Sequence, residues 1–537
     1  MSRALIIASA AYIDAELQAE FGRLPPSFLP IGNRRLFVHQ HAAFRETVSR
    51  VILSLPDDFN PGPLDIELLD ELGIEIVHVP GGLSLGQSIV YVINVAAAAG
   101  EQLAILHGDT LLRGVGHAAS DAVSVAPLPS NYAWGEVRVE DGAVHPADDA
   151  SHRDDPASAV LSGYFVFTEP VRLVQAITRA GGSFLAGLHG YGQSSKLRAL
   201  AAAEWLDFGH ANTYHQSRGR VTTQRAFNDL HATPRLVVKS ARDTAKIAAE
   251  ARWFDRLPPP LRAYAPAFLG MRDTASGPGY ALEYLYLPTL ADLFVFGRLT
   301  PMAWGHIFDA CDEYLTACIA YPAPPGTADD AEALYGGKAR QRLEELARTT
   351  GIDIDAACRF NGQHLPSLRR MAELAAQAVP AAEPGRHMRL VHGDFCFSNI
   401  LYDARASLVR VIDPRGVTAD GQATPYGDVR YDLGKFHHSV VGRYDHILAG
   451  YYRLQDHGPT DVTLDLRNDP ESRDVEALYR ARSLAGFTIE SAASHAVSVL
   501  LFLSMLPLHA DDAQRQRALM ANAMRLFLAM ETRAAAA

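Results

Sequence analysis

The stretch LVHGDFCFSNILYDARASLVRVIDPRG, residues 390–416, sets three polar side chains in a fixed order. Asp394 is followed five residues later by Asn399, and Asp413 comes 14 residues after that. The segments ILYD, ARAS and LVRVID have the pattern of a strand, a turn and a second strand, which predicts a hairpin that returns Asp413 to Asn399. A carboxylate that orients a hydroxyl, together with an amide oxygen and a second carboxylate that hold magnesium, is the set that phosphoryl transfer needs.

This stretch resembles the aminoglycoside phosphotransferase and choline kinase family, whose motif reads HGD, an asparagine five residues after the aspartate, and ID at the end of a hairpin. The resemblance implies that Asp394 is the catalytic base and that Asn399 and Asp413 bind Mg²⁺, with ATP as the phosphoryl donor. It also implies a strand lysine that grips nucleotide phosphates and pairs with a helix glutamate. Lys239 in RLVVKSA and Glu250 in KIAAEARWF occupy suitable places.

The region before Lys239 departs from that family, because no glycine-rich loop precedes the lysine. Hydroxyl, amide and guanidinium groups can replace such a loop as phosphate donors. The segment GRVTTQRAFNDLHATP offers Thr222, Thr223, Arg225 and Asn228.

Two further residues near the motif have alternative interpretations. Arg415, which follows the Asp-Pro dipeptide, either binds phosphate or pairs with Asp428 or Asp432. We expect His392 to pack and hydrogen-bond the loop of Asp394 rather than to react. A kinase-like fold without activity is the alternative for the whole region.

The tripeptide His-Gly-Asp occurs a second time in LAILHGDTLL, residues 103–112. Here Asp109 has no asparagine five residues later and no returning ID, so a duplicated kinase is excluded. Short apolar runs (ALIIASA, RVILSLP, IEIVHVP and LAILHGD) alternate with helix-like segments, which predicts an α/β fold with a mostly parallel sheet and helices on both faces. Ligands of such sheets gather at the carboxyl ends of the strands, where we expect Asp109.

Four segments of this half resemble the nucleotidyltransferase family that makes nucleotide sugars and CDP-alcohols. They are FLPIGNRRLFVHQ (28–40), GLSLGQSI (82–89), LAILHGDTLL (103–112) and EWLDFGHANTY (204–214). The resemblance implies a Rossmann-like fold, Mg²⁺ ligands at Asp109 and Asp207, and base recognition by Gly86 and Ser88. In this chemistry a substrate phosphate attacks the α-phosphorus of an NTP and pyrophosphate leaves, so a carboxylate-held metal and nearby cations are required.

The first strand departs from the nucleotidyltransferase pattern. That family has a glycine-rich loop with an arginine and a later lysine, whereas ASAAYIDAELQAEFGRLPPS has one glycine and Pro26 at the lysine position. Arg23, Arg34 or Arg35 can supply the missing charge, and Arg23 is our candidate for nucleotide binding. A glycine-serine turn that caps a helix is the alternative for Gly86 and Ser88, and a binding-only domain is the alternative for the whole region.

The chain of 537 residues is too long for one ordinary core. We predict a nucleotidyltransferase-like domain over 1–215, then a bilobal kinase-like α+β domain with an N-lobe over 216–300 and a mainly helical C-lobe over 301–537. The polar and basic segment 215–225 is the predicted junction.

Bulk composition excludes several classes of protein. The net charge of -12 argues against a general nucleic-acid binder. The four cysteines have no CxxC spacing, as expected for buried or incidental thiols in a reducing compartment. The apolar run VSVLLFLSMLPLH (497–509) is shorter than the ~20 residues that span a bilayer, so it predicts a core helix, no membrane insertion and a cytoplasmic protein.

The two predicted reactions are consecutive, because a kinase makes the phosphate ester that a nucleotidyltransferase consumes. The pairing resembles fused proteins associated with capsule and other surface-polysaccharide synthesis. We therefore predict a bifunctional enzyme that uses Mg²⁺, ATP and a second NTP (CTP, UTP or GTP) on a small hydroxylated compound, a sugar, polyol or amino alcohol. The alternatives are a kinase with a binding-only N-terminal domain and a non-catalytic scaffold.

The aromatic residues bear on the choice of acceptor, because an amine such as choline would need an aromatic or acidic pocket. We interpret the aromatics of the second half as core or lobe-packing residues, which favours a sugar or polyol. These are Trp253, Tyr284, Tyr286, Trp304 and Tyr314.

Overall fold

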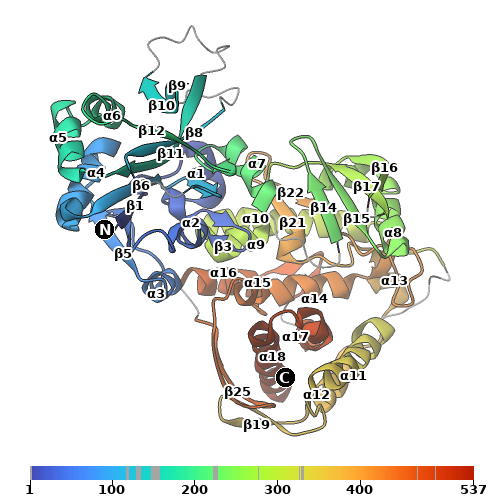
Figure 1. Cartoon of the computed structure of the whole chain (residues 1–537). Coiled ribbons are helices and arrows are strands. Elements are labelled where there is room, and N and C mark those ends of the chain that lie inside the picture. Colours follow the sequence, from blue (N-terminus) through green and yellow to red (C-terminus); the bar gives the residue numbers. More distant parts are fainter. Residues whose placement is uncertain are drawn as a thin grey trace. The chain divides into compact units, whose positions relative to one another are not determined.

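The computed structural model of the chain divides into two compact units, Met1–Thr222 and Thr223–Ala537 (Figure 1). It describes residues 3–116, 120–127, 135–146, 158–221, 228–275, 277–325, 327, 332–467, 470–489 and 492–536. The division falls within the segment predicted as the junction. Helix α7 (Ala211–Val221) runs through the first part of that segment, so the polar sequence there is helical rather than irregular.

The first unit is built on a nine-stranded sheet. Its first four strands pair in parallel in the order β5-β4-β1-β6, and they are the four apolar runs of the sequence. Their bounds are Arg3–Ala8 (β1), Arg50–Pro56 (β4), Ile74–Val79 (β5) and Gln102–His107 (β6). This half has the parallel arrangement that the strand–helix alternation predicts.

The second half of the sheet is mixed, so the prediction of a mostly parallel sheet is wrong there. Strand β11 is antiparallel to both β6 and β8, and β9 and β10 form a hairpin. The hairpin turns at Asp141 and Gly142, both with positive φ, which is the Asp-Gly signature of a tight hairpin turn. The bounds are Ala122–Ala126 (β8), Glu136–Glu140 (β9), Ala143–Pro146 (β10), Ser158–Phe167 (β11) and Arg198–Ala201 (β12).

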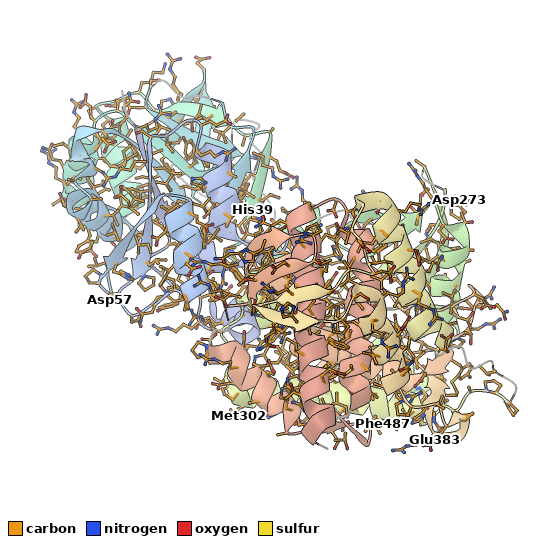
Figure 2. The ribbon with its side chains drawn as sticks, turned by 90° about the horizontal axis from the view of Figure 1, so that it is seen from below. His39, Asp57, Asp273, Met302, Glu383 and Phe487 are labelled. Carbon is orange, nitrogen blue, oxygen red and sulfur yellow. The ribbon has the colours of Figure 1, made fainter. Side chains whose placement is uncertain are left out.

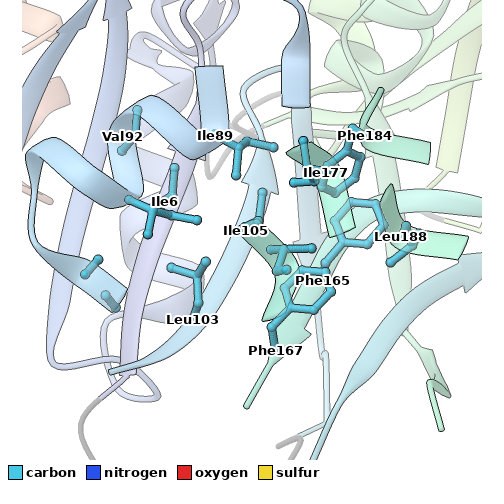
Figure 3. Close-up of a cluster of buried hydrophobic side chains, with 14 of the residues drawn as sticks. Ile6, Ile89, Val92, Leu103, Ile105, Phe165, Phe167, Ile177, Phe184 and Leu188 are labelled. Carbon is cyan, nitrogen blue, oxygen red and sulfur yellow. The ribbon is translucent and has the colours of Figure 1, made fainter. Parts of the chain in front are cut away.

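Helices lie on both faces of this sheet. On one face α4 (Leu85–Val95), α5 (Pro170–Arg179) and α6 (Phe184–Gly192) pack on alternate strand residues such as Ile6, Ile105 and Phe165 (Figure 3). Tyr164 points to the opposite face, where its ring stacks on Phe44 of α2 (Leu36–Phe44). Each large apolar side chain buried in this way stabilises the unit by about 1.5–3 kcal/mol.

Shorter elements complete the first unit. They are α1 (Ala15–Phe21), η1 (Pro26–Phe28), β2 (Pro30–Ile31), β3 (Arg34–Arg35), α3 (Pro63–Glu71), η2 (Ala98–Gly100), β7 (Thr110–Arg113) and β13 (Glu204–Asp207). Strands β7 and β13 pair with each other outside the main sheet.

The second unit begins with an antiparallel sheet in the order β14-β15-β17-β16. Its strands are Asn228–Ala232 (β14), Leu236–Ala241 (β15), Phe268–Thr274 (β16) and Gly277–Glu283 (β17). Helix α8 (Thr244–Asp255) buries Ile247, Ala251 and Phe254, the apolar stripe of its sequence, and a short η4 (Pro259–Tyr264) follows.

Helices dominate the rest of the second unit. They are α9 (Leu290–Phe296), α10 (Pro301–Ile319), η5 (Ala333–Gly337), α11 (Lys338–Thr350), α12 (Leu368–Ala378), α13 (Pro384–His387), η6 (Phe397–Asn399), α14 (Val429–Val440), α15 (Tyr444–Leu448), α16 (Pro470–Arg480), α17 (Ala492–Met505), η7 (Leu506–His509) and α18 (Ala513–Ala536). Met302, near the start of α10, is exposed at the edge of the unit (Figure 2).

Residues 497–505 of the apolar run near the C-terminus lie in α17, and residues 506–509 form η7. Helix α17 packs against α12, α14 and α18, which confirms the predicted core helix. Within the described ranges, none of the helices has the length and apolarity to cross a membrane. The four cysteines, Cys311, Cys318, Cys358 and Cys396, are free and buried, as expected.

A four-stranded sheet among these helices was not predicted. It has the order β19-β18-β25-β24, with bounds Cys358–Phe360 (β18), Gln363–Leu365 (β19), Arg453–Gly458 (β24) and Asp461–Asp465 (β25). Its strands are too short to show a clear alternation of apolar and polar residues. Asn361 and Gly362, both with positive φ, nevertheless mark a hairpin turn. Short pairs complete the unit: β20 (Met388–Leu390) with β23 (Tyr426–Asp428), β21 (Ile400–Asp403) with β22 (Leu408–Val411), and β26 (Ser483–Leu484) with β27 (Phe487–Thr488).

Candidate active sites

The hairpin predicted after Asp394 is present. Strands β21 and β22 pair from Ile400 opposite Val411, and the Ile412 amide donates to the Asn399 carbonyl at 3.0 Å. The ladder therefore reaches the residue before Asp413 and brings that aspartate beside Asn399. Asp413 has a φ of 57°, which is uncommon for a residue other than glycine and marks a locally strained backbone.

Asp394 is held by two partners. The amide nitrogen of Asn399 donates to the Asp394 carbonyl at 3.0 Å and to Oδ2 of its carboxylate at 3.1 Å. Lys435 of α14 lies 2.7 Å from the other carboxylate oxygen, Oδ1. Burial raises the pKa of Asp394, but the Lys435 ammonium outweighs it and holds that pKa well below its usual value. The carboxylate is therefore ionised at neutral pH.

Lys239 joins three elements of the second unit. Its ammonium lies 2.8 Å from Glu250 Oε2 on α8 and 3.0 Å from Asp413 Oδ1, and the Tyr280 hydroxyl also donates to Glu250 at 2.8 Å. Burial lowers the pKa of Lys239, but Asp413 and Glu250 outweigh it and hold that pKa above its usual value. The lysine is thus charged and is fixed beside Asp413.

His392 supports the loop, as expected. The Asp394 amide donates to Nδ1 of His392 at 3.2 Å, so the other ring nitrogen, Nε2, carries the proton toward the Ile412 carbonyl at 2.9 Å. Burial lowers the pKa of His392 to about 4, which keeps the ring neutral. Trp253 packs under the same loop, with its ring 5.7 Å from that of His392.

Asp432 is a loop-fixing residue that the sequence did not assign. Its two carboxylate oxygens accept from the amides of His392 at 2.7 Å and Gly393 at 2.8 Å. Burial raises the pKa of Asp432 to about 7. Asp428 pairs with Arg430 at 2.6 Å. Within the described part of the chain Arg415 pairs with neither aspartate, so that interpretation of Arg415 is wrong.

The predicted phosphate donors Thr222, Thr223 and Arg225 lie outside the described residues, as does the side chain of Asn228. The aromatic residues of the second half have packing roles. Tyr284 and Tyr286 contact each other, Trp304 stacks on Phe397 and Tyr314 stacks on Phe395.

The first unit brings Asp109 and Asp207 together through β7 and β13. The Phe208 amide donates to the Asp109 carbonyl at 2.8 Å. Gly209 lies against both carboxylates, because a Cβ at that position would be 2.8 Å from Asp109 Oδ2 and 3.6 Å from Asp207 Oδ1. Burial and the charge of Asp109 raise the pKa of Asp207 to about 7. Of the lysines and arginines that the structure describes, none pairs with either aspartate.

The turn that carries Asp109 is fixed from β1 and α2. The Gly108 amide donates to the Ala8 carbonyl at 2.9 Å, and a Cβ on Gly108 would lie 2.8 Å from that oxygen. The side-chain amide of Gln40 donates to the carbonyls of Gly108 at 3.0 Å and Thr110 at 2.9 Å. Ser27 also donates to the Gly108 carbonyl, at 3.1 Å. Gln40 and Ser27 were not assigned from the sequence, although Gln40 ends the segment 28–40.

Two of the three candidate arginines of the first unit are already paired, whereas Arg34 on β3 is exposed and forms no ion pair within the described residues. Arg23 lies 2.8 Å from Asp58 and 3.8 Å above the Tyr12 ring, with 60% of its side chain exposed. Arg35 is buried and donates twice to Asp65, at 2.9 and 2.8 Å, so its role is structural.

Gly86 and Ser88 lie in the first turns of α4. A Cβ on Gly86 would be 2.5 Å from the Gly182 carbonyl, so close packing explains the glycine. The cap of α4 is Ser84, whose hydroxyl accepts from the Gln87 amide at 3.2 Å, and Ser88 lies one turn further on. Base recognition by Gly86 and Ser88 stays a prediction.

Neither carboxylate site amounts to a large metal-binding cluster. No group of three or more His, Cys, Asp or Glu side chains suited to a metal ion occurs among the described residues. Asp109 with Asp207 offers two carboxylates, and Asp413 with Asn399 offers a carboxylate and an amide oxygen.

Comparison with known proteins gives matches to solved structures alone. No family model matches the chain, and no curated protein matches it. One solved structure that it resembles is UTP-bound UGPase from Acinetobacter baumannii, 14% identical over 41% of this chain and 92% of that one, with a TM-score of 0.30. HddC from Yersinia pseudotuberculosis is 14% identical over 41% of this chain and 99% of that one, with a TM-score of 0.29.

A second kind of solved structure includes the gentamicin–APH(2″)-IIa complex. It is 13% identical over 56% of this chain and 88% of that one, with a TM-score of 0.32. Because these identities and TM-scores are low, the function has to be inferred from the two carboxylate sites themselves.

Proposed function

We propose that the second unit is a small-molecule kinase that transfers the γ-phosphoryl group of ATP to a hydroxyl. The observation that carries the proposal is the position of Asp394 between Asn399 and Lys435, with Asp413 and Lys239 at the adjacent hairpin. Four of these groups come from the sequence prediction and lie on different elements. Their convergence supports phosphoryl transfer, which depends on positioning and electrostatic stabilisation.

Asp394 orients the acceptor hydroxyl in this proposal. Asn399 and Lys435 fix its two oxygens, and its low pKa keeps it ionised. A carboxylate with a low pKa is a weak base, but a loose phosphoryl-transfer transition state needs the proton to leave late. Lys239, held by Glu250, binds the nucleotide phosphates.

Asn399 and Asp413 would hold Mg²⁺, which when bound neutralises charge on the phosphates of ATP. The donor set fits this role. Both hydrogen bonds of the Asn399 amide nitrogen go to Asp394, which leaves the amide oxygen for a cation. The Asp413 side chain is 45% exposed, so one oxygen remains available beside Lys239.

We propose that the first unit transfers a nucleotidyl group from a second NTP (CTP, UTP or GTP) to the phosphate ester, giving an NDP-sugar or NDP-polyol for surface-polysaccharide synthesis in the cytoplasm. Asp109 and Asp207 would hold Mg²⁺ there. Their fit rests on Gly209, whose missing Cβ leaves room beside both carboxylates, and on the buried Asp207 Oδ2, which has no hydrogen-bond partner among the described residues. Two neighbouring carboxylates, of which Asp207 is largely buried, are unfavourable unless a cation joins them.

A second candidate is an active kinase whose first unit only binds nucleotide. The pairing of Arg23 with Asp58 and of Arg35 with Asp65 favours it, because these candidate cations are already engaged.

The test is an assay of the purified chain with ATP, each second NTP and a library of sugars, polyols and amino alcohols. We expect ADP and pyrophosphate release, with Asp394→Asn lowering ADP release about 10³-fold or more and Asp109→Asn removing pyrophosphate release. Asp273→Asn is the control, because Asp273 is exposed on β16 (Figure 2). If Asp394→Asn releases ADP at the wild-type rate, the kinase proposal is refuted. If the wild type releases ADP but no pyrophosphate, the second candidate, a kinase whose first unit only binds nucleotide, is favoured.

A further inference from the structure

Three cations gather beside Asp394. Lys435 lies 2.7 Å from its carboxylate, and the Lys435 ammonium is 6.0 Å from the centre of the Tyr431 ring. The Arg415 guanidinium lies 4.8 Å from the centre of the same ring. Lys338, at the start of α11, is close enough to interact electrostatically with Tyr431, Arg415, Lys435 and Asp394. One buried tyrosine is thus surrounded by positive charge.

Arg415 is fixed by the backbone of the catalytic loop. Its amide donates to the His392 carbonyl at 2.9 Å, and Gly393, with a φ of 76°, makes room for its side chain, since a Cβ there would lie 2.6 Å from the Arg415 Cβ. Its Nη1 is buried and has no hydrogen-bond partner among the described residues. A buried guanidinium nitrogen without an acceptor is costly, so this position favours a bound anion.

Of the nearby carboxylates, Asp394 pairs with one of these cations, Lys435. Asp428 is engaged by Arg430 and Asp432 by the backbone amides of the loop. Asp394 alone faces Lys435, Arg415 and Lys338. In the described part of the chain no ion pair is formed by Lys338 or Arg415.

The protonation of the surrounding groups reflects the same excess of positive charge. Tyr431 raises the pKa of Lys338, but burial, Arg415 and Lys435 outweigh it and leave that pKa below its usual value. Burial raises the pKa of Tyr431, but Arg415, Lys338 and Lys435 outweigh it and lower that pKa. A bound anion beside these groups would raise both pKa values again.

We propose that the acceptor of the kinase carries an anionic group, a carboxylate or a phosphate ester, which Arg415 and Lys338 bind beside Tyr431 while the acceptor hydroxyl reaches Asp394. The inference rests on the proposed kinase function and narrows its substrate class. A guanidinium binds either anion with two parallel hydrogen bonds, and an ammonium adds a point charge. A cationic amino alcohol would be repelled at this position.

The test compares matched sugars that differ in charge: glucose, glucosamine, gluconate and glucose 6-phosphate. Binding of each to the full chain is measured by calorimetry with a non-hydrolysable ATP analogue present, and phosphorylation is measured separately with ATP. We expect binding of gluconate or glucose 6-phosphate in preference to the neutral and cationic sugars. The relative affinity of the two anions distinguishes a carboxylate from a phosphate.

Arg415→Gln and Lys338→Met should each weaken binding of the preferred anion about 10- to 100-fold, with binding of the ATP analogue unchanged. Arg359→Gln is the control, because Arg359 is an exposed residue of β18, and it should change neither affinity. Equal melting temperatures of the variants exclude unfolding as the cause of weaker binding.

Three results would overturn the inference: preferred binding of glucosamine or glucose, binding of none of the four sugars, or a loss in Arg415→Gln of affinity for the ATP analogue alone. The last result would show that Arg415 binds the nucleotide rather than the acceptor. Anion binding that depends on Arg415 but is not accompanied by phosphorylation of any compound would support the anion site and refute the kinase, so the two failures are distinguishable.

Discussion

The tripeptide His-Gly-Asp occurs in both units, and its two copies differ in backbone and in charge. Gly393 has a φ of 76° and its amide binds Asp432, whereas the Gly108 amide binds the carbonyl of Ala8. Asp394 is paired with Lys435, which holds its pKa low, but Asp207 beside Asp109 is raised to a pKa of about 7 by burial and by that neighbour. The same tripeptide therefore lies beside a lysine in one unit and beside a second carboxyl in the other.

The difference shows that the partners of an aspartate decide its chemistry more than the residues next to it. In the second unit Asp394 and Asp413 each have a cation before any ligand binds, since Lys435 pairs with Asp394 and Lys239 pairs with Asp413. In the first unit the two carboxylates lie beside Gly209, and no lysine or arginine among the described residues pairs with them. The second site is thus preformed, whereas in our proposal a metal ion completes the first.

The largest effect is expected from Lys239→Met. This change leaves Glu250, 1% exposed, and Asp413 without their shared cation, and breaking a buried pair costs about 3–5 kcal/mol. Urea unfolding of the second unit measures the loss. Lys246→Met is the matched control, because Lys246 is half-exposed and 3.8 Å from Glu250. Equal losses in both variants would contradict a preformed site.

Lys435→Met tests the partner of Asp394. Without the ammonium, burial dominates and the pKa of Asp394 rises, so the carboxylate becomes protonated at higher pH than in the wild type. We expect kcat of the kinase to fall about 100-fold and its pH profile to acquire an acidic limb. A fall in kcat with an unchanged profile would show that Lys435 does not set the ionisation of Asp394.

The pH dependence of Mg²⁺ binding separates the two sites. Asp207, with a pKa of about 7, must lose a proton to bind the cation, so Mg²⁺ affinity of the first unit should fall about tenfold for each pH unit below 7. We expect a smaller change in the second unit, whose proposed ligand Asp413 has the Lys239 ammonium 3.0 Å away. Titration of Mn²⁺, followed by paramagnetic relaxation, measures both. In Asp207→Asn the metal affinity of the first unit should no longer depend on pH. An equal pH dependence of metal affinity in the two units would contradict the proposed difference between the sites.

Local patterns allowed the sequence to predict much of this fold. The apolar runs of β1, β4, β5 and β6, the α8 stripe and the hairpin from β21 to β22 are each encoded within a few residues. The pairing of Lys239 with Glu250 followed from the family resemblance. The mixed half of the first sheet and the four-stranded sheet of the second unit were missed, although the Asp141-Gly142 and Asn361-Gly362 turns marked their hairpins.

The residues that set the site electrostatics could not be found in this way. Lys435 and Asp432 lie on α14, far along the chain from the loop that they fix, and Gln40 reaches Gly108 from α2. Each is an ordinary polar residue in its own helix. Its role depends on tertiary packing, which neither hydrophobic period nor turn chemistry encodes.

The contrast between the sites is tested most directly by Asp207→Asn and Asp394→Asn, two changes that remove one charge and keep the shape of the side chain. Hydrogen exchange at pH 8 without metal measures how far the amides are protected: those of β7 and β13 in Asp207→Asn, and those of β21 and β22 in Asp394→Asn, each relative to the wild type. A carboxyl with a raised pKa loses folding stability as pH rises from its unfolded pKa of about 4 to that raised value, so Asp207→Asn should increase protection at pH 8, and the increase should shrink as pH falls toward 4. Asp394→Asn should decrease protection, because Lys435 loses its partner. A change of the same sign in both units would contradict the account.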